Sequence, residues 1–301
     1  MIKVENLNFS YQKGVQIINN LSFEVPQGSI YGFLGGNGAG KTTTIRIILG
    51  LCKADSGKVF INGKPFSGKS YQQYRKIGAM IEEPSLYPHI SGNENLRLLA
   101  NYYKVNQKRI NEVLELVGLS DAKHKKAGNY SLGMKQRLGI AQSLLHNPEI
   151  LILDEPINGL DPRGIKEIRE LLFRLRDEGK TIFISSHILG EVEKSCDNLC
   201  IIDNGTKVFS DKTTNLQTLL FKEIQYQINC NDSKKVQEFF LKNKVKTELV
   251  DDTNIIISLP NDKIIAEYLK QIMAENVSLF EVRKKKNSLE DMFIKLTQTN
   301  N

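Results

Sequence analysis

The segment from Gly35 to Thr43 is the part of the chain whose residue types and spacing most clearly predict a chemistry. It reads Gly-Gly-Asn-Gly-Ala-Gly-Lys-Thr-Thr and follows an apolar run, which is the pattern of a phosphate-binding loop between a strand and a helix. Glycines let backbone N–H groups turn toward an anion, and the helix start adds its positive dipole end. Lys41 is expected to reach the β- and γ-phosphates of a nucleotide, and the Thr42 hydroxyl to bind Mg²⁺. The phosphate-binding residues expected in this segment are Gly35, Asn37, Gly38, Ala39, Gly40, Lys41, Thr42 and Thr43.

Two adjacent carboxylates, Asp154 and Glu155, follow the apolar run 150–153. They stand at the carboxyl end of an expected buried strand, where α/β sheets bind their ligands. We expect Asp154 to hold Mg²⁺ through water and Glu155 to orient and polarise the attacking water, a general-base contribution of about 10²–10⁴ in rate. His187 follows the apolar segment 181–184, so it is expected at the same end of a neighbouring strand, within reach of the γ-phosphate.

A second anion-binding helix start is expected at Ser131. The sequence places Ser131 as the N-cap of a helix with an apolar stripe, and its hydroxyl and backbone N–H groups can bind phosphate. One nucleoside triphosphate needs only one phosphate loop. A second anion-binding helix start therefore favours binding of the phosphates from another direction, by a second subunit. The stripe consists of Met134, Leu138, Ala141 and Leu145.

Short apolar and alternating segments indicate the elements that must position these motifs. Strands are expected at 2–7, 17–25, 30–34, 58–61, 77–81, 150–153 and 182–184, and helices at 43–51 and 165–176. Residues 91–146 predict a helical subdomain, in which Ser91 and Glu94 form a capping box and Gly118 ends a helix. Buried strands joined through helices indicate parallel α/β architecture.

Beyond Leu220 the pattern changes to short strands at 224–228 and 255–259 and a later helical stripe. We therefore expect two domains, residues 1–220, with a helical subdomain at about 85–146, and a small C-terminal domain, residues 221–301. The residues of the stripe are Leu289, Met292, Phe293 and Leu296.

The charge, hydrophobicity and cysteine content limit the type of protein but do not identify its binding partner. A net charge of +7 over 301 residues is compatible with nucleic acid, anionic lipid or plain solubility, and the basic cluster 283–286 is interpreted as a solvated strand end, with a lipid- or partner-facing patch as the alternative. No apolar run reaches the length of a membrane span, and the start lacks a signal peptide, so a cytoplasmic location is expected. Four scattered cysteines predict neither disulfides nor a zinc site.

In this order, the motifs resemble the nucleotide-binding subunits of ATP-binding cassette (ABC) transporters over residues 1–220. The family's phosphate loop usually has a proline where Gly36 stands, and its signature Leu-Ser-Gly-Gly-Gln is matched by residues 130–134. The resemblance implies a P-loop NTPase of the α/β class, with a RecA-like parallel sheet core, an antiparallel β subdomain, a helical subdomain and a small C-terminal α+β domain. It implies an ATPase that uses ATP and Mg²⁺, acts as a homodimer, and lies at the inner face of the cell membrane on an integral-membrane permease.

The resemblance also implies roles for single residues. Tyr11 would stack on adenine, and His187 would be the switch histidine. Asp161, in the loop 158–161, would touch the second subunit. Glu82 stands where the family has a glutamine that binds Mg²⁺, and it adds a negative charge near the triphosphate, so a sharper metal dependence is expected. The signature residues that would act on the partner's ATP are Ser131, Leu132, Gly133 and Met134.

The surroundings of Glu82 refine the comparison. The sequence around this position is similar to that of the ATPases of lanthipeptide (lantibiotic) self-protection exporters, at Glu82, Pro84, Tyr87 and residues 92–96. Two other segments, 131–137 and 288–293, resemble those of drug- and bacitracin-type exporters. The predicted function is export of a lantibiotic, peptide antibiotic or drug for self-protection. Efflux of bacitracin, several drugs or ions is the alternative.

Two functions of other classes are also compatible with a phosphate-binding loop. An ABC-type ATPase acting on DNA or ribosomes would suit the positive charge, but Lys41 and Ser131 are 90 positions apart (131 minus 41), without the long coiled-coil insertion of DNA-repair relatives, and the chain carries a single cassette. No nucleic-acid partner is expected. A small-molecule kinase would use the same phosphate loop, but the paired carboxylates and the Ser131 cap favour hydrolysis. For residues 221–301, dimer support and docking to the membrane subunit both remain open.

Overall fold

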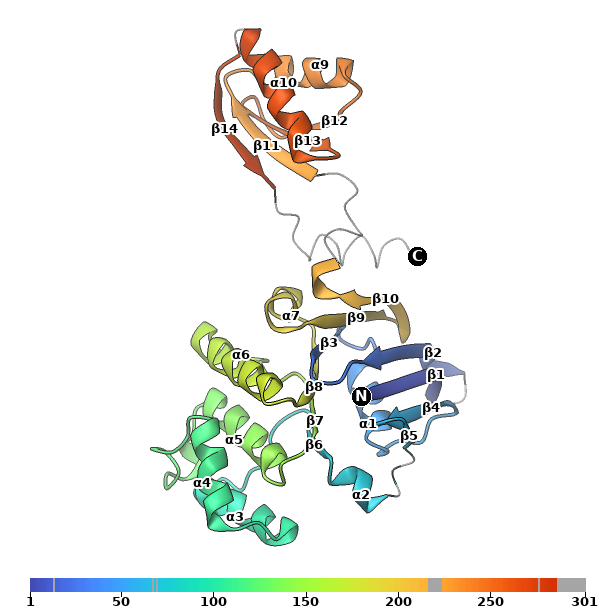
Figure 1. The fold of residues 1–301 in the computed structure, drawn as a ribbon, viewed down its shortest axis with the longest axis vertical. Coiled ribbons are helices and arrows are strands. Elements are labelled where there is room, and N and C mark those ends of the chain that lie inside the picture. The colour runs from blue at the N-terminus through green and yellow to red at the C-terminus, as the bar shows by residue number, and fades with distance from the viewer. Residues whose placement is uncertain (13, 67, 69, 216–223, 276, 286–301) are drawn as a thin grey trace. The chain divides into compact units, whose positions relative to one another are not determined.

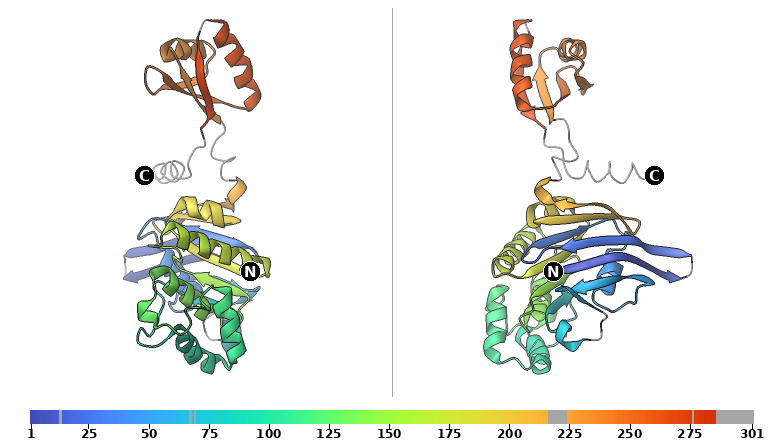
Figure 2. Two further views of the ribbon diagram at one scale, coloured as in Figure 1. Left: turned by 90° about the vertical axis from the view of Figure 1, so that its left-hand side faces the viewer. Right: turned by 45° about the vertical axis from the view of Figure 1, so that its right-hand side comes forward.

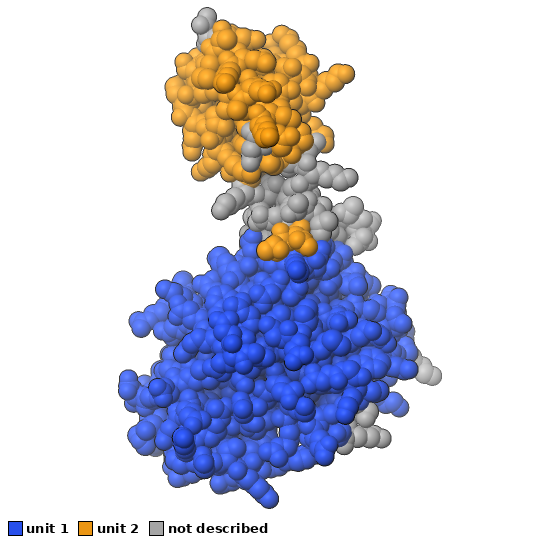
Figure 3. Space-filling model, in the orientation of Figure 1, with its two compact units in different colours: residues 1–213 blue, residues 214–301 orange. Residues whose placement is uncertain are grey.

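The computed structural model describes residues 1–12, 14–66, 68, 70–215, 224–275 and 277–285. These fall into two compact units, unit 1 with residues 1–213 and unit 2 with residues 214–301 (Figure 3). The domain boundary expected near Leu220 lies outside the described residues, as does the helical stripe expected at 289–296.

A six-stranded sheet forms the centre of unit 1, in the order β10-β9-β3-β8-β7-β6 (Figure 1). The strands from β9 to β6 run parallel, and β10 pairs antiparallel to β9. Three of the strands, β3, β7 and β8, are buried at every position, because both faces of this sheet are covered. The bounds are β3 (Ile30–Leu34), β6 (Ile77–Met80), β7 (Ile150–Leu153), β8 (Thr181–Ser186), β9 (Asn198–Asp203) and β10 (Thr206–Lys212).

Helices cover one face of the central sheet, and a second sheet covers the other (Figures 1 and 2). The helical face carries α5 (Leu132–Leu144), α6 (Pro162–Asp177) and α7 (Leu189–Ser195). The opposite face packs on α1 (Lys41–Ile48) and on the antiparallel sheet β2-β1-β4-β5. The Phe23 ring of β2 lies 5.1 to 6.0 Å from the rings of three aromatic residues on β3 and β8, which joins the two sheets. The bounds are β1 (Ile2–Gln12), β2 (Val15–Val25), β4 (Ser56–Ile61) and β5 (Lys64–Pro65).

The helical subdomain contains α3 (Gly92–Tyr103), α4 (Gln107–Leu116), the short 3₁₀ helix η1 (Ala127–Asn129) and α5, and α2 (Tyr71–Tyr74) precedes β6. The capping box predicted at the start of α3 is confirmed: Ser91 N–H donates to Glu94 Oε2 at 2.8 Å, and Glu94 N–H donates to Ser91 Oγ at 3.2 Å. The helix predicted at 43–51 instead spans α1, because Leu49 is its C-cap and the next residue, Gly50, takes a φ of +68°.

Unit 2 has a β-α-β-β-α-β order, and its antiparallel sheet runs β12-β13-β11-β14. This is a ferredoxin-like topology, which confirms the predicted small α+β domain. Arg283 and Lys284 lie exposed on β14, Lys285 is exposed directly after it, and Lys286 lies outside the described residues. The bounds are β11 (Ile224–Cys230), α9 (Ser233–Lys242), β12 (Lys246–Leu249), β13 (Asn254–Leu259), α10 (Asp262–Ala274) and β14 (Leu279–Lys284).

All four cysteines are free thiols, and Cys196, Cys200 and Cys230 are buried. Cys196 is the C-cap of α7 and Cys200 lies in β9. Among the residues that the structure describes, no helix combines the length and the apolar character of a membrane span.

Candidate nucleotide site

The loop between β3 and α1 has the backbone that an anion cradle needs. Gly40, at the N-cap of α1, takes a φ of +100°, and a Cβ there would lie 3.2 Å from the carbonyl oxygen of Ile17, so this position requires glycine. Gly36 differs: a Cβ there would meet no atom within 4 Å, and its φ lies outside the left-handed region. The loop therefore has room for a side chain at the position where the proline usually stands.

Lys41 extends back over this loop. Its Nζ donates to the carbonyl oxygens of Gly35 at 2.8 Å and Gly36 at 3.1 Å, and it lies 3.2 Å from Glu155 Oε1. The Lys41 side chain is only 7% exposed, so its charge sits in a site with few water molecules to screen it. The structure thus places the predicted phosphate-binding ammonium next to the predicted general base.

The carboxylate of Asp154 is the hub of the site's hydrogen bonds. Its Oδ2 accepts from the Thr42 hydroxyl at 2.7 Å, and its Oδ1 accepts a short hydrogen bond from the Ser185 hydroxyl. Asp154 is 1% exposed, and a buried carboxylate needs such partners. Ser185 also accepts from Glu155 N–H at 2.9 Å. The sequence analysis missed Ser185, although its place at the end of β8, two residues before His187, was a signal.

Glu155 lies between Lys41 and His187. Its Oε2 is 2.9 Å from His187 Nδ1, and in this hydrogen bond the imidazole N–H donates to the carboxylate. The backbone of Glu155 takes a φ of +48°, a conformation that costs a non-glycine residue about 1–3 kcal/mol and that clusters at functional sites. The predicted catalytic pair, Glu155 and His187, is therefore brought together.

Three residues outside the loop lie on or beside α1. The hydroxyl of Tyr11 lies 3.3 Å from Thr43 Oγ1, and its ring is exposed at the site's edge. Glu82 follows β6 and pairs with Arg46, whose Nη2 is 2.6 Å from Glu82 Oε1. Arg46 was not among the predicted site residues, although it stands four positions after Thr42, on the same face of α1.

The signature residues lie in a separate place. Ser131 caps α5, where its Oγ accepts from Met134 N–H at 3.2 Å. Asp161 caps α6 in the same way, accepting from Gly164 N–H at 2.9 Å. Both helix starts open into one hollow of about 440 Å³, whose lining includes no residue of the phosphate loop. The lining of the hollow includes Ser131, Leu132, Gly133, Met134 and Asp161.

Comparisons with known proteins decide the family. A family model described as ABC transporter matches residues 18–158. The bacitracin transport ATP-binding protein BcrA of Bacillus licheniformis is 42% identical over 312 aligned positions, which cover 98% of this chain and 97% of that protein. This chain belongs to the ABC transporter family. It is an ATP-binding subunit, an ATPase that powers a separate membrane permease.

Two further comparisons concern the extent of the match to a lantibiotic transporter and the fold of the cassette of this ABC ATPase. The lantibiotic transport ATP-binding protein SrtF of Streptococcus pyogenes is 42% identical over 230 residues, which cover 75% of this chain and 99% of that protein. The dimeric structure of the ATP-binding cassette MJ0796, bound to ADP and Pi, has a TM-score of 0.64 and 26% identity, covering 71% of this chain and 99% of that chain. The P-loop NTPase fold predicted from the motifs is thus confirmed.

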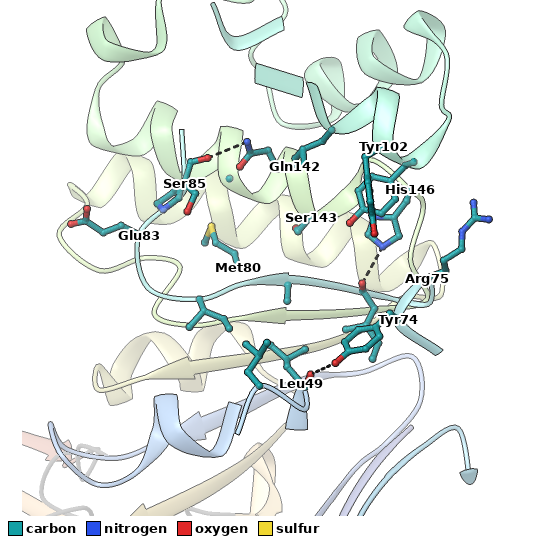
Figure 4. A pocket seen from close by; sticks show the side chains of 18 of the residues that line it. Leu49, Tyr74, Arg75, Met80, Glu83, Ser85, Tyr102, Gln142, Ser143 and His146 are labelled. Atoms are coloured by element: carbon teal, nitrogen blue, oxygen red, sulfur yellow. Dashed lines mark hydrogen bonds between the residues drawn. The ribbon is translucent and has the colours of Figure 1, made fainter. Parts of the chain in front are cut away.

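A groove of about 620 Å³ separates the central sheet of the ABC ATPase from its helical subdomain (Figure 4). Met80 and Glu83 enter it from β6 and the loop that carries Glu82, while Tyr102 and His146 enter it from the helical side. Three hydrogen bonds brace its walls: Tyr74 Oη donates to Leu49 O at 2.8 Å, Gln142 Nε2 donates to Ser85 O at 3.4 Å, and His146 Nε2 lies 3.0 Å from Ile77 O. Its lining is mainly apolar and aromatic.

Proposed function

We propose that two copies of this subunit clamp ATP between them and that their closing drives a permease that exports a peptide antibiotic. The observation that carries the proposal is the division of the phosphate-binding groups. Lys41, Thr42, Asp154 and Glu155 share one site, whereas Ser131 opens into a different hollow of the same unit. In the described part of unit 1 the two sets of groups do not share a pocket, and a second copy would bring them together.

Within one subunit, each residue has a task that its contacts support. Lys41 binds the β- and γ-phosphates, because its buried ammonium is already aimed across the loop. Glu155 takes the proton of the attacking water, and His187 holds the Glu155 carboxylate from its other oxygen. Tyr11 is exposed beside Thr43 and stacks on adenine. Backbone N–H groups and a hydroxyl are contributed by the other predicted phosphate-binding residues, which are residues 35, 37 to 40 and 43.

The donor set beside the phosphate loop fits Mg²⁺. Thr42 and Asp154 present a hydroxyl and a carboxylate in direct contact, and Mg²⁺ in nucleotide sites takes one or two such protein oxygens together with phosphate and water. Bound there, the ion would neutralise charge on the β- and γ-phosphates. Glu82 would approach the same ion only after leaving Arg46.

In the proposed homodimer, the signature residues 131–134 of one chain bind the γ-phosphate of the nucleotide held by the other. Ser131 supplies a hydroxyl and the start of α5. The half-exposed side chain of Leu132 packs toward Gly159, since a Cβ on Gly159 would lie 3.1 Å from Leu132 Cδ2. Asp161 follows in the same loop and contacts the second subunit. The relative MJ0796, which shares this fold, is dimeric with ADP and Pi.

The groove beside Glu83 fits a short apolar segment of the permease. Its lining is mainly apolar and aromatic, and one wall is the loop that carries Glu82. A segment seated there would move together with that loop, and so with the nucleotide site. This docking places the ATPase at the inner, cytoplasmic face of the cell membrane.

The similarity to BcrA favours a peptide antibiotic of the bacitracin type as cargo. That relative is matched along nearly its whole length, whereas the match to SrtF leaves a quarter of this chain unmatched. A lantibiotic, which was predicted from the sequence around Glu82, is the second candidate cargo among the peptide antibiotics. No nucleic acid is expected as partner.

The test is deletion of the gene in its host, followed by challenge with bacitracin, a lanthipeptide and an unrelated drug. We expect selective sensitisation to a peptide antibiotic, restored by the wild-type chain and not by a Lys41→Ala chain expressed at the same level. Unchanged tolerance to all three compounds would contradict the proposed cargo. Restoration by Lys41→Ala would contradict the proposed use of ATP.

A further inference from the structure

Arg46 lies beside the phosphate loop and contacts Glu82, which follows β6. It lies on α1, one turn beyond Thr42, so both side chains point from the same face of the helix. Its Nη2 is 2.6 Å from Glu82 Oε1. The expected metal-binding hydroxyl and the guanidinium that holds Glu82 therefore stand side by side on one rigid element.

Glu82 is held in an unusual conformation. Its φ is +58°, a left-handed backbone that non-glycine residues seldom adopt without support from their surroundings. Arg46 is the charged group that contacts its side chain in the described part of unit 1. The two side chains are 37% and 60% exposed, so water screens the pair, and pairs of this kind are weak enough to open and re-form.

Tyr11 also acts on Arg46. The Tyr11 hydroxyl is the largest cause that raises the pKa of Arg46, and the charge of Glu82 adds to it. The same Tyr11 hydroxyl lies 3.3 Å from Thr43 Oγ1. The residue expected to stack on adenine and the residue in place of the family's metal-binding glutamine therefore both influence the charge of Arg46.

The net charge near the triphosphate explains why an arginine next to Glu82 matters. A carboxylate near a triphosphate is repelled by it, whereas the glutamine usual at this position is neutral. A glutamate together with an arginine carries the same net charge as one glutamine. The extra negative charge at Glu82 is therefore compensated by a residue of this chain.

We propose that Arg46 is a positioning residue that neutralises Glu82 and holds its carboxylate beside α1, so that nucleotide and Mg²⁺ bind together without repulsion. This proposal rests on the proposed function, since it concerns the same nucleotide site. It predicts that the effect of replacing Arg46 on nucleotide binding depends on which residue stands at position 82.

The experiment is a double-mutant cycle on the full-length subunit that also carries Glu155→Gln, so that hydrolysis does not interfere. Arg46→Gln, Glu82→Gln and the double variant are compared for binding of a fluorescent ATP analogue, with Mg²⁺ titrated and with EDTA present. We expect Arg46→Gln alone to weaken Mg²⁺-dependent binding roughly tenfold, and to change it less than about threefold when residue 82 is already glutamine. Arg46→Lys, which keeps the charge, is expected to restore most of the affinity.

Two results would overturn the proposal. An equal loss from Arg46→Gln in both backgrounds would show that Arg46 acts on the helix and not through Glu82, and no loss in either would show that the pair is a surface ion pair without effect. Lys76→Gln is the matched control, because Lys76 forms an exposed pair with Glu149 at 2.8 Å before the start of β6 and is expected to leave nucleotide binding unchanged. Nucleotide binding by the isolated subunit requires neither dimer nor permease, so failure here is distinct from failure of the proposed export.

Discussion

The Thr42 hydroxyl and the Asp154 carboxylate lie 2.7 Å apart, although 112 positions separate them along the chain. The contact exists because β3 and β7 run parallel on either side of β8 and end at the same edge of the sheet. The strand between them contributes Ser185, which bonds to the second oxygen of Asp154. Three neighbouring strands thus hold one carboxylate in a defined orientation.

Replacing Thr42 by valine keeps the side chain's shape and removes the hydroxyl from Asp154. Since hydrogen bonds to charged groups contribute about 1.5–3 kcal/mol, we expect Mg²⁺-dependent binding of ATP to weaken by at least tenfold, with little change in EDTA. Fluorescence titration of a labelled nucleotide measures both, and Thr42→Ser serves as the control that retains the hydroxyl. Equal losses with and without Mg²⁺ would contradict the assigned role.

Replacing Glu155 by glutamine removes the general base while leaving the Lys41 site in place. We expect ATP hydrolysis to fall by about 10²–10⁴ and ATP-bound dimers to accumulate in size-exclusion chromatography. Adding Ser131→Ala is expected to abolish these dimers without weakening binding of ATP to a single chain.

The control for the serine variant must remove a helix cap of similar strength elsewhere. Asn106 caps α4, with its side chain accepting from Arg109 N–H at 3.1 Å, and Asn106→Ala costs about 1 kcal/mol of stability, as Ser131→Ala does. Dimers that persist in the Glu155→Gln, Ser131→Ala chain, or vanish equally with Asn106→Ala, would argue against a shared nucleotide.

Two glycines of the phosphate loop should respond in opposite ways to alanine. Gly40→Ala places a Cβ 3.2 Å from Ile17 O at a φ of +100°, so nucleotide affinity and the thermal unfolding midpoint should both fall. Gly36→Ala enters open space, so affinity should be kept and stability should rise by up to about 1 kcal/mol, since alanine restricts the unfolded chain. Calorimetry and nucleotide titration test both variants, and a loss of affinity in Gly36→Ala would show that this glycine is required.

His146 predicts a pH dependence of stability. Its ring stacks on Tyr103 at 4.3 Å, and its Nε2 lies 3.0 Å from Ile77 O. Burial lowers the pKa of His146, the carbonyl of Ile77 opposes the shift, and three nearby cations, Arg75, Arg109 and Lys180, add to it.

Because the pKa is lower in the folded state than its ordinary value near 6.5, the contribution of neutral His146 is present above about pH 6.5 and is lost as the pH falls through the folded-state value. We expect the unfolding midpoint to fall between pH 7.5 and pH 5.5, and to fall less in His146→Gln, which stays neutral. Identical falls in both proteins would exclude His146 as the cause.

The local features of the site could be predicted from the sequence because they depend on residues a few positions apart. The phosphate loop, the caps at Ser91 and Ser131 and the strand ahead of Asp154 follow from spacing and backbone preference alone. The topology of unit 2 could not be read in this way, since strand order depends on pairings between distant segments.

The sequence by itself determined that this protein has a nucleotide site, because glycines, a lysine and paired carboxylates carry that chemistry wherever the chain brings them together. Only the tertiary structure decided which groups meet. Ser185 reaches Asp154, and Arg46 reaches Glu82, because strand order and helix orientation set these distances, and neither is encoded in the spacing of neighbouring residues.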